Sequence, residues 1–507
     1  MSSLAQPLAQ SLVQSVDWLA IAPPTIAAVA GLVVLVADLF VRDAKKALLG
    51  WASVAGLAVS ALMLLPLLDG DRSTFCLTGD PGVCSYTADR FTLVIQFLVL
   101  GGALLAALLS VTALKDANKE LPEGEFWFLL LSSAAGAALL PASRDLATLI
   151  VALEVASLPA FALVGIKRGD RKSSEAALKF FLSSVTATAV SLMGVSFVYA
   201  STGTLYLTEI ATKIQDVDGQ LHTLAQAGVV LTLVGFAFKT AAVPFHFWVP
   251  DTYVGAPLPV AAYLSVVGKA VGFTGLILVT VIALPSYADV WGPALAALAA
   301  LTMTIGNVGA LRQQATRAYS AVRLLAWSSV GQAGYLLVPI AAAAYSQDAE
   351  KAIGSTVAYA LMYAAVNLGA FAVAALVART KPLNRISDYR GLYASRPLSA
   401  LVLGFFLLCL AGLPPGIIGL FAKVTVFSAA VDAGLGWLAV VMAVNVVIAL
   451  FYYLQWTTLL FRAPEGEPER HRVPVPLTAA IALTAVLGVA LSGAPQLVLR
   501  FSDTGLF

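Results

Sequence analysis

The feature that most constrains this chain is a succession of long apolar runs separated by short polar stretches. A helix needs about 20 consecutive apolar residues to cross the hydrocarbon core of a bilayer, and run after run reaches that length. Of the 507 residues, 60% are hydrophobic and only 11% are charged, and the mean hydropathy is +0.89. The chain is therefore predicted to be an all-α, polytopic membrane protein.

The apolar runs predict fourteen transmembrane helices, numbered here as spans 1 to 14. Residues 1–18 lack a basic segment followed by a small-residue cleavage site, so no cleaved signal peptide is expected. The spans lie near residues 19–41, 48–68, 91–114, 124–142, 145–166, 175–200, 225–250, 256–284, 291–311, 318–341, 352–377, 398–430, 436–461 and 475–500.

The loops between the spans divide into a basic set and a set with few positive charges. The loops after spans 1, 3, 5, 9, 11 and 13 hold nineteen of the 30 Lys and Arg residues, and the opposite loops hold six. Short cytoplasmic loops collect positive charge, so both termini are expected on the non-cytoplasmic side of the cytoplasmic (inner) membrane. A net charge of +2 without a basic tail provides no positive patch that could bind a phosphate backbone, so nucleic acid is not an expected partner.

The loop from Asp69 to Arg90 is predicted on the outside and contains Cys76 and Cys84 in a Gly/Pro-rich setting. A disulfide is permitted on that side, and two free thiols in a flexible loop fit the spacing equally well. Cys409 lies in span 12 and is expected to pack as a small apolar residue.

Proline interrupts two spans that lie five helices apart, with Pro244 in span 7 and Pro414 and Pro415 in span 12. A repeat with an odd number of helices places its two copies in opposite orientations, and paired interrupted spans point to an ion or substrate pathway at the repeat interface. We predict discontinuous helices 7 and 12 in two inverted five-helix repeats. The single membrane domain, 1–507, then comprises spans 1–3 in 1–123, the repeats in 124–290 and 291–461, and span 14 in 462–507.

Four charged residues stand near mid-depth in these spans, namely Glu154, Lys239, Lys269 and Lys423. Each charge there costs about 2.5 to 3.5 kcal/mol on insertion scales, so such residues call for an explanation. A fixed ion pair between Glu154 and Lys239 is the structural interpretation, and snorkelling to the interface is the alternative for Lys423. Lys269 and Lys423 have no acidic partner in their own spans, which favours a proton relay.

Other residues narrow the possible chemistry. Gln332 in span 10 cannot titrate and is predicted at most to hold a water. The three histidines, His222, His246 and His471, lie in loops or at the break, so no pair within the spans could hold a haem iron. The sequence has no CxxC, GxGxxG or GxxxxGK[ST], and we expect no metal, redox centre or nucleotide on this chain.

Several of these segments together resemble a known family. FKTAAVPFHFWVPDTYVGAP in span 7, RLLAWSSVGQAGY in span 10 and AGLPPGIIGLFAKVTVFSAAVDAG in span 12 are similar to the antiporter-like subunits of respiratory complex I and of Mrp-type sodium/proton antiporters. SSEAALKFFLSSVTATAVSLMGVSFVYASTGTL in span 6 most resembles the N subunits of bacterial NADH:quinone oxidoreductases.

The resemblance implies a proton-translocating subunit driven by quinone reduction in neighbouring subunits. It implies that Glu154 is the acid of span 5, Lys239 its partner in span 7, Lys269 the central relay lysine and Lys423 the terminal lysine. It further implies that FMN, iron-sulfur clusters and quinone belong to partner subunits, and that the partners are other membrane subunits of complex I, including further antiporter-like subunits. The alternative is a subunit of a Mrp-type antiporter without electron transfer, and a third interpretation is an assembly scaffold whose charges are structural.

Overall fold

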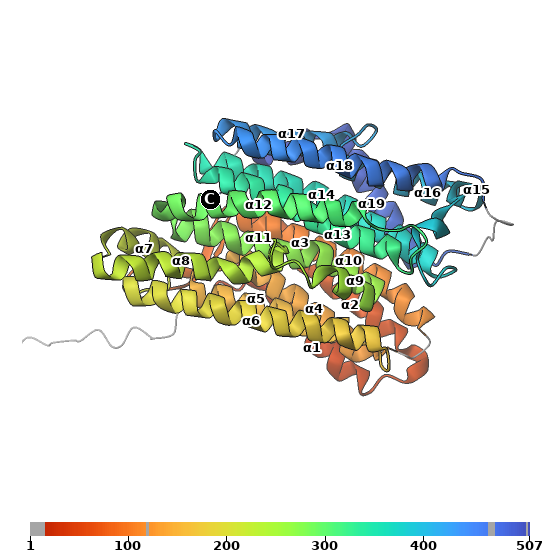
Figure 1. The fold of residues 1–507 in the computed structure, drawn as a ribbon. Coiled ribbons are helices and arrows are strands. Elements are labelled where there is room, and N and C mark those ends of the chain that lie inside the picture. Colours follow the sequence, from red (N-terminus) through yellow and green to blue (C-terminus); the bar gives the residue numbers. More distant parts are fainter. Residues whose placement is uncertain (1–15, 118–120, 218, 465–471, 503–504, 507) are drawn as a thin grey trace, which may run out of the picture.

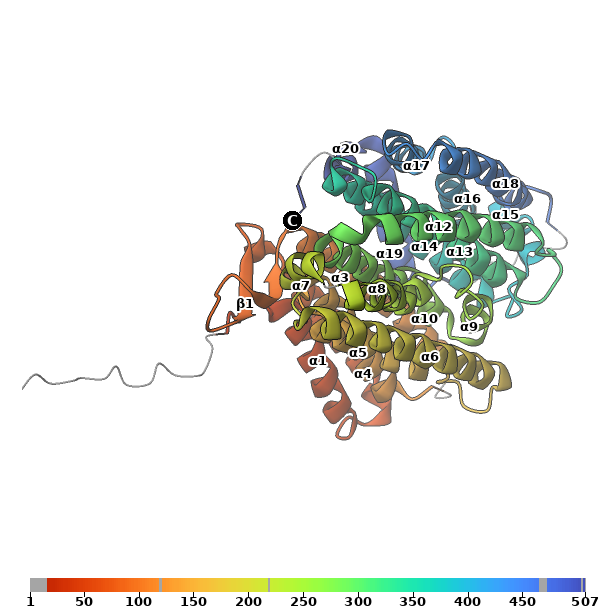
Figure 2. The ribbon, with the colours of Figure 1, turned by 60° about the vertical axis from the view of Figure 1, so that its left-hand side comes forward.

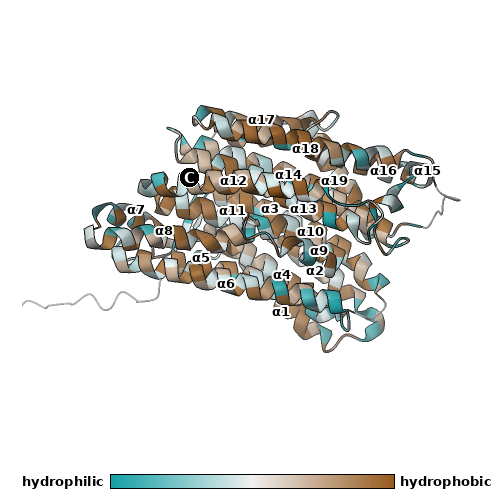
Figure 3. Ribbon diagram, viewed as in Figure 1, coloured by the Kyte–Doolittle hydropathy of each residue, from teal (hydrophilic) through white to brown (hydrophobic). Residues whose placement is uncertain are grey.

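The protein is a bundle of long helices that lie side by side, with apolar residues along the helices and polar residues gathered towards their ends (Figures 1 and 3). The computed structural model describes residues 16–117, 121–217, 219–464, 472–502 and 505–506. Lys119, Arg470 and His471, and nearly all of the segment tested for a signal peptide, lie outside the described residues.

The helices of the described chain follow the predicted spans closely. In the first half they are α1 (Ala22–Asp38), α2 (Ala47–Leu62), α3 (Arg90–Asp116), α4 (Glu123–Leu139), α5 (Leu146–Val164), α6 (Arg171–Thr202), α7 (Leu207–Lys213), α8 (Gly219–Thr240), α9 (Val249–Gly255), α10 (Leu258–Tyr263) and α11 (Lys269–Ile277). In the second half they are α12 (Ala288–Leu311), α13 (Ser320–Ala343), α14 (Ala349–Ala378), α15 (Leu392–Ser395), α16 (Pro397–Ala411), α17 (Ile417–Asp432), α18 (Gly436–Leu460), α19 (Val475–Gly493) and α20 (Gln496–Leu499).

Length and composition identify membrane spans among these helices. Within the described residues, twelve helical stretches are long and apolar enough to cross a bilayer, and α1 and α16 are shorter apolar helices. The predicted all-α polytopic membrane fold is therefore confirmed. The total of fourteen spans, the inverted repeats and the division of the domain into segments stay predictions.

The predicted breaks in helices 7 and 12 are present. Helix 7 stops at Thr240 and restarts with α9 at Val249, and helix 12 stops at Ala411 and restarts with α17 at Ile417. In helix 12 the two halves touch, because a Cβ on Gly419 would lie 2.0 Å from the carbonyl oxygen of Cys409. Pro244, Pro414 and Pro415 are exposed on the surface of the bundle.

A short hairpin is the exception to the helical architecture. Strands β1 (Arg72–Cys76) and β2 (Cys84–Ala88) pair antiparallel within the loop that was predicted to lie outside. A disulfide joins Cys76 and Cys84 across this pair. The hydroxyl of Tyr86 donates to the carbonyl of Ala20 at 3.0 Å, which ties the hairpin to the start of the bundle.

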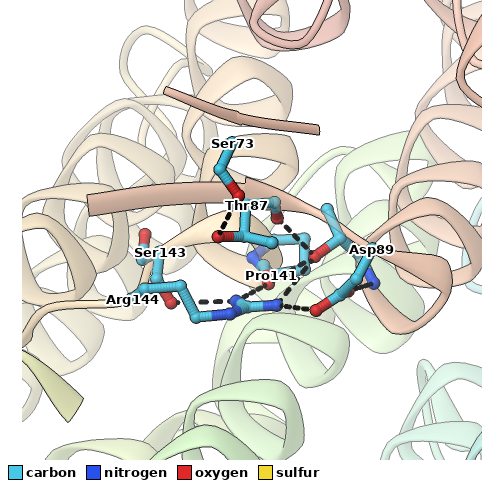
Figure 4. A network of polar contacts seen from close by, with 7 residues as sticks. Ser73, Thr87, Asp89, Pro141, Ser143 and Arg144 are labelled. Carbon is cyan, nitrogen blue, oxygen red and sulfur yellow. Dashed lines mark hydrogen bonds and ion pairs between the residues drawn. The ribbon is translucent and has the colours of Figure 1, made fainter. Parts of the chain in front are cut away.

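A buried ion pair fastens the end of the hairpin to the loop before α5 (Figure 4). Arg144 donates hydrogen bonds to Asp89, to the carbonyl of Pro141 at 2.8 Å and to the carbonyl of Ser143 at 3.0 Å. Asp89 also caps α3 by accepting from the backbone N–H of Thr92 at 2.9 Å. Each carboxylate oxygen thus has a partner, as a buried charge requires.

The structure separates the basic loops from the hairpin. At one end, called the basic end here, Arg379 contacts both Asp116 and the carbonyl of Arg472, so three basic loops meet. At the other end, called the hairpin end, the backbone N–H of Asp17 donates to Thr74 and that of Phe91 to the carbonyl of Leu506. The first and last described residues therefore both lie at the hairpin end (Figure 2).

Candidate functional site

Lys239 and Glu154 lie on neighbouring helices without forming a direct ion pair. In the described structure the carboxylate of Glu154 accepts a hydrogen bond from Thr188 of α6 at 2.7 Å, and no ion pair within 4 Å joins it to Lys239. The two charges act on each other through space. A fixed pair that locks two helices is therefore not what this geometry provides.

Aromatic rings surround the ammonium of Lys239 instead. Its Nζ lies 4.9 Å from the ring centroids of Phe161 and Phe180 and 5.7 Å from that of Phe238. Ring faces attract a cation by about 0.5 to 2 kcal/mol each when desolvated. The ammonium is thus stabilised by groups that do not exchange protons with it.

A small cavity connects Lys239 with the start of span 8. The cavity measures about 20 Å³, and its lining includes Lys239, Ser157 and Gly268. Ser133 and Tyr263 also line it, and the Tyr263 hydroxyl donates to Ser133 at 2.8 Å. Most of the lining is apolar, but a space of this size is large enough for one water, since a water needs roughly 10 to 15 Å³.

Lys269 is the first residue of α11 and follows a π-helical turn, Leu264–Gly268. It is buried, and its Nζ has no hydrogen-bond partner in the part of the chain that the structure describes. Ser265, four residues before Lys269, lies in this π turn. π turns occur frequently at functional sites, and this one reshapes the helix just before the lysine.

Span 8 packs tightly against the end of α8. A Cβ on Gly272 would lie 2.3 Å from the backbone nitrogen of Thr240 and 2.7 Å from the carbonyl carbon of Lys239. Only glycine allows this approach, which brings the helices of Lys239 and Lys269 into backbone contact.

Hydroxyl and amide groups of α13 and α14 extend from Ser265. The Tyr363 hydroxyl lies 3.1 Å from the carbonyl of Ser265 and 2.8 Å from the Ser329 hydroxyl. Asn367 donates to the Ser265 hydroxyl at 2.6 Å. Tyr363 and Asn367 stand one helical turn apart on α14, so both reach the same turn of span 8.

Gln332 lies next along α13 and is bonded at both ends of its amide. Its Oε1 accepts from the Tyr359 hydroxyl, and its Nε2 donates to the Tyr453 hydroxyl at 3.1 Å. Ser328 lies 2.5 Å from the same Tyr453 hydroxyl. The link at Gln332 is thus built from side chains, and the water predicted there stays a prediction.

Lys423 lies at the far end of this polar series. Its Nζ donates to the carbonyls of Leu410 at 2.7 Å and Ala411 at 2.9 Å, and it lies 5.4 Å from the ring centroid of Tyr335. Lys423 is 3% exposed, so it does not snorkel to the surface. The carbonyl end of a helix carries about half a negative charge, and the end of α16 therefore serves as the counter-charge.

A second group of charges lies at the basic end. Asp251 of α9 contacts Lys179 of α6 at 2.8 Å and Arg323 of α13 at 3.5 Å, while Glu175 contacts Lys179 at 2.7 Å. The ammonium of Lys179 and the guanidinium of Arg323 thus find acidic partners near the interface. The ion pairs of Asp251 could not be predicted from sequence spacing, because Lys179 and Arg323 belong to other helices.

Sequence reasoning missed the tyrosines of the site. Tyr335, Tyr359, Tyr363 and Tyr453 are buried within spans, where a tyrosine looks like an ordinary apolar residue. The four-residue spacing of Tyr359 and Tyr363, continued by Asn367, places three polar groups on one helical face and was the available signal. Among the described residues, no group of three His, Cys, Asp or Glu side chains could hold a metal ion.

Comparison with known proteins places this arrangement in a family. Residues 143–449 match the model of the NADH:quinone oxidoreductase/Mrp antiporter transmembrane family, and this range contains Glu154, Lys239, Lys269 and Lys423. NADH-quinone oxidoreductase subunit N 2 of Streptomyces griseus is 75% identical over 98% of this chain and 96% of its own length. Subunit N of Salinispora tropica is 44% identical over 89% of this chain and 86% of its own length.

Solved structures agree with this assignment. A chain of respiratory complex I from Thermus thermophilus is 31% identical, covers 94% of this chain and 98% of its own length, and superposes with a TM-score of 0.75. A chain of the Mrp complex from Dietzia sp. has a TM-score of 0.81 at 22% identity, with 96% of both chains covered, and shares the fold. The chain belongs to the antiporter-like membrane subunits of the NADH:quinone oxidoreductase/Mrp family and, within it, to the N subunits of NADH-quinone oxidoreductases.

Proposed function

We propose that this chain translocates protons across the bacterial inner membrane as an antiporter-like subunit of NADH:quinone oxidoreductase, through Glu154, Lys239, Lys269 and Lys423. The observation that carries the proposal is a set of three buried lysines, none of which is neutralised by direct contact with a carboxylate, with hydroxyl and amide groups between Lys269 and Lys423. Charged residues at this depth are expensive and serve proton relays in membrane proteins.

The geometry supports a relay in which charge is passed along the bundle. The carboxylate of Glu154 stabilises the ammonium of Lys239 by Coulomb attraction. The two groups are not in direct contact, so they can move apart without breaking an ion pair. A movement that takes the carboxylate away removes this support and favours proton transfer through the small cavity towards Lys269. The hydroxyls around Ser265 and Gln332 continue the series towards Lys423.

The proposal extends to partners and cofactors. The electron-transfer chemistry lies in other subunits, so FMN, iron-sulfur clusters and quinone are assigned to them and no redox centre to this chain. Its neighbours are other membrane subunits, including further antiporter-like ones. The basic end faces the cytoplasm, and both termini lie on the opposite side. The Mrp-type alternative has support from the shared fold, whereas the curated relatives at 75% and 44% identity favour the oxidoreductase.

Neutralising the relay tests the proposal. In inverted membrane vesicles carrying the intact complex, Lys269→Ala or Glu154→Gln is expected to lower the number of protons pumped per NADH oxidised, because a relay without its central charge cannot pass a proton on. Native gel electrophoresis checks that the complex assembles. An assembled Lys269→Ala complex that pumps as the unsubstituted one does would refute the relay. Loss of assembly in every neutral variant would instead support the scaffold interpretation.

A further inference from the structure

A charged cavity lies at the basic end, between α6, α9 and the start of α13. Its volume is about 340 Å³, and none of the four relay residues lines it. Its lining includes four cationic and two acidic side chains, so it carries a surplus of two positive charges. The six residues are Lys172, Lys179, Arg317, Arg323, Glu175 and Asp251.

The two carboxylates of the cavity are committed to two of the four cations. Glu175 and Asp251 both contact Lys179, and Asp251 also contacts Arg323. In the part of the chain that the structure describes, no carboxylate lies within 4 Å of the ammonium of Lys172 or of the guanidinium of Arg317. Both of these residues are exposed. The surplus positive charge therefore lies on these two side chains, where a ligand can reach it.

Tyr319 holds one of the two surplus cations at the cavity. The Nζ of Lys172 lies 4.5 Å from the centroid of the Tyr319 ring, and a ring face attracts an ammonium without neutralising its charge. Tyr319 directly precedes α13, whose first turn has no acidic residue and no side-chain cap. The start of a helix carries about half a positive charge. The start of α13 thus adds to the attraction that Lys172 and Arg317 exert on an anion.

An exposed apolar stripe of α6 begins beside this cavity. Leu178 stands three residues after Glu175, and Leu182 stands three residues after Lys179, so the stripe borders the charged lining. An anion-attracting cavity that adjoins an apolar stripe matches a phospholipid, because a free phosphate ion would leave the stripe uncovered. The stripe consists of four residues at the spacing of one helical face, each 40% to 57% exposed: Leu178, Phe181, Leu182 and Val185.

We propose that this cavity binds the phosphate of an anionic phospholipid through Lys172 and Arg317, with the acyl chains of the lipid lying along the stripe of α6. Basic pockets between transmembrane helices on the cytoplasmic side bind anionic headgroups, and arginine contacts phosphate oxygens with paired N–H donors. The bound lipid joins the starts of α6 and α13 beside α9, the second half of the broken helix 7. The binding does not depend on proton transfer through the relay.

The first test uses a photoactivatable phosphatidylglycerol on the purified, intact complex. With a diazirine in the upper part of an acyl chain, this lipid should crosslink to α6 between Leu178 and Val185, as mapped by peptide mass spectrometry. Unlabelled phosphatidylglycerol should prevent the crosslink, whereas zwitterionic phosphatidylcholine and inorganic phosphate should not. Equal competition by phosphatidylcholine would show that the surplus charge plays no part. Equal competition by inorganic phosphate would show a site for free anions. Either result overturns the proposal.

The second test removes the two surplus charges. Lys172→Ala combined with Arg317→Ala should weaken the crosslink about 25-fold at a subsaturating lipid concentration, since each Lys or Arg near a membrane surface contributes about a factor of five. The matched control is Arg312→Ala combined with Lys381→Ala, which removes two exposed positive charges at the same end but outside the cavity. An unchanged crosslink in the Lys172→Ala, Arg317→Ala complex overturns the proposal.

A third variant keeps the test decisive if the neutral variant assembles poorly. Lys172→Arg combined with Arg317→Lys retains both charges and should retain the crosslink, with assembly checked by native electrophoresis. Leu178→Cys asks what covers the stripe. If a thiol crosslinker joins Leu178→Cys to a neighbouring subunit in high yield, protein covers the stripe and the proposal is wrong. None of these measurements uses proton pumping, so their outcome is independent of the proposed relay.

Discussion

Lys423 shows how one residue can fasten two half-helices and still be free to change its charge. It donates to the carbonyls of Leu410 and Ala411, which end α16, from its own place in α17. A protonated lysine has three N–H donors and a neutral one has two. Both forms can therefore satisfy the two carbonyls, so loss of the proton need not separate α16 from α17.

This argument predicts different results for two neutral substitutions of Lys423. Lys423→Gln keeps N–H donors for the carbonyls and removes the charge, so the complex should assemble but pump fewer protons per NADH. Lys423→Met removes the donors as well and should cost about 1 to 3 kcal/mol for carbonyls left unpaired, which lowers assembly too. Native electrophoresis and vesicle acidification measure the two effects. Full pumping by an assembled Lys423→Gln complex would contradict a relay role.

At the residue scale, the charged residues of the site could be predicted from the sequence, but the polar groups around them could not. Glu154, Lys239, Lys269 and Lys423 were conspicuous because a charge inside an apolar run is costly wherever the chain goes next. Tyr359 and Tyr363 were not, because a tyrosine in a span is also a good apolar residue. Their spacing shows that they share one face of a helix, but their hydroxyl contacts to Gln332 and Ser329 of another helix are not encoded in any local pattern.

Among the elements, the contact between α11 and the end of α8 decides how close the two central lysines come. The breaks themselves were predictable, since a proline in a helix interior removes a backbone hydrogen bond, although Pro159, Pro293 and Pro339 are accommodated inside continuous helices. The π turn at Leu264–Gly268 was not, because it has no comparable sequence signal. The β1–β2 hairpin was also missed: a Cys76–Cys84 bridge and two free thiols in a flexible loop were both left open, and the strands are too short to show a clear alternation.

Gly272 provides the test of this contact. Gly272→Val should push α11 away from Thr240 and Lys239, at a cost of about 1 to 3 kcal/mol for overpacking, and should lower pumping per assembled complex. Gly101→Ala is the control, because a Cβ at Gly101 meets no atom within 4 Å. The measurement is protons pumped per NADH together with the thermal stability of the purified complex. If both variants behave like the unsubstituted complex, the close approach is not needed for transfer.

For the whole molecule, hydropathy and the family resemblance predicted the fold class and the family, and the structure adds which loops share an end. Loops that are far apart in sequence meet there, as Asp116 with Arg379 and Lys179 with Asp251 show. The sequence could assign these loops to one side by their charge alone. It could not show that a cavity of about 590 Å³ lies beside the Asp116–Arg379 pair, because residues of six separate helices line it.

Orientation is the prediction that belongs to this scale, because the side that the basic end faces decides the direction in which the proposed relay moves protons. Positive loops remain on the cytoplasmic side during insertion, so Lys381→Cys should react with an impermeant thiol reagent from the cytoplasmic face. Gln215→Cys, exposed near α7, should react only from the opposite face, because a backbone bridge between Asp145 and Tyr206 holds this region at the hairpin end. The reversed labelling pattern would place the basic end on the non-cytoplasmic side, and the loop charges would then have predicted the orientation wrongly.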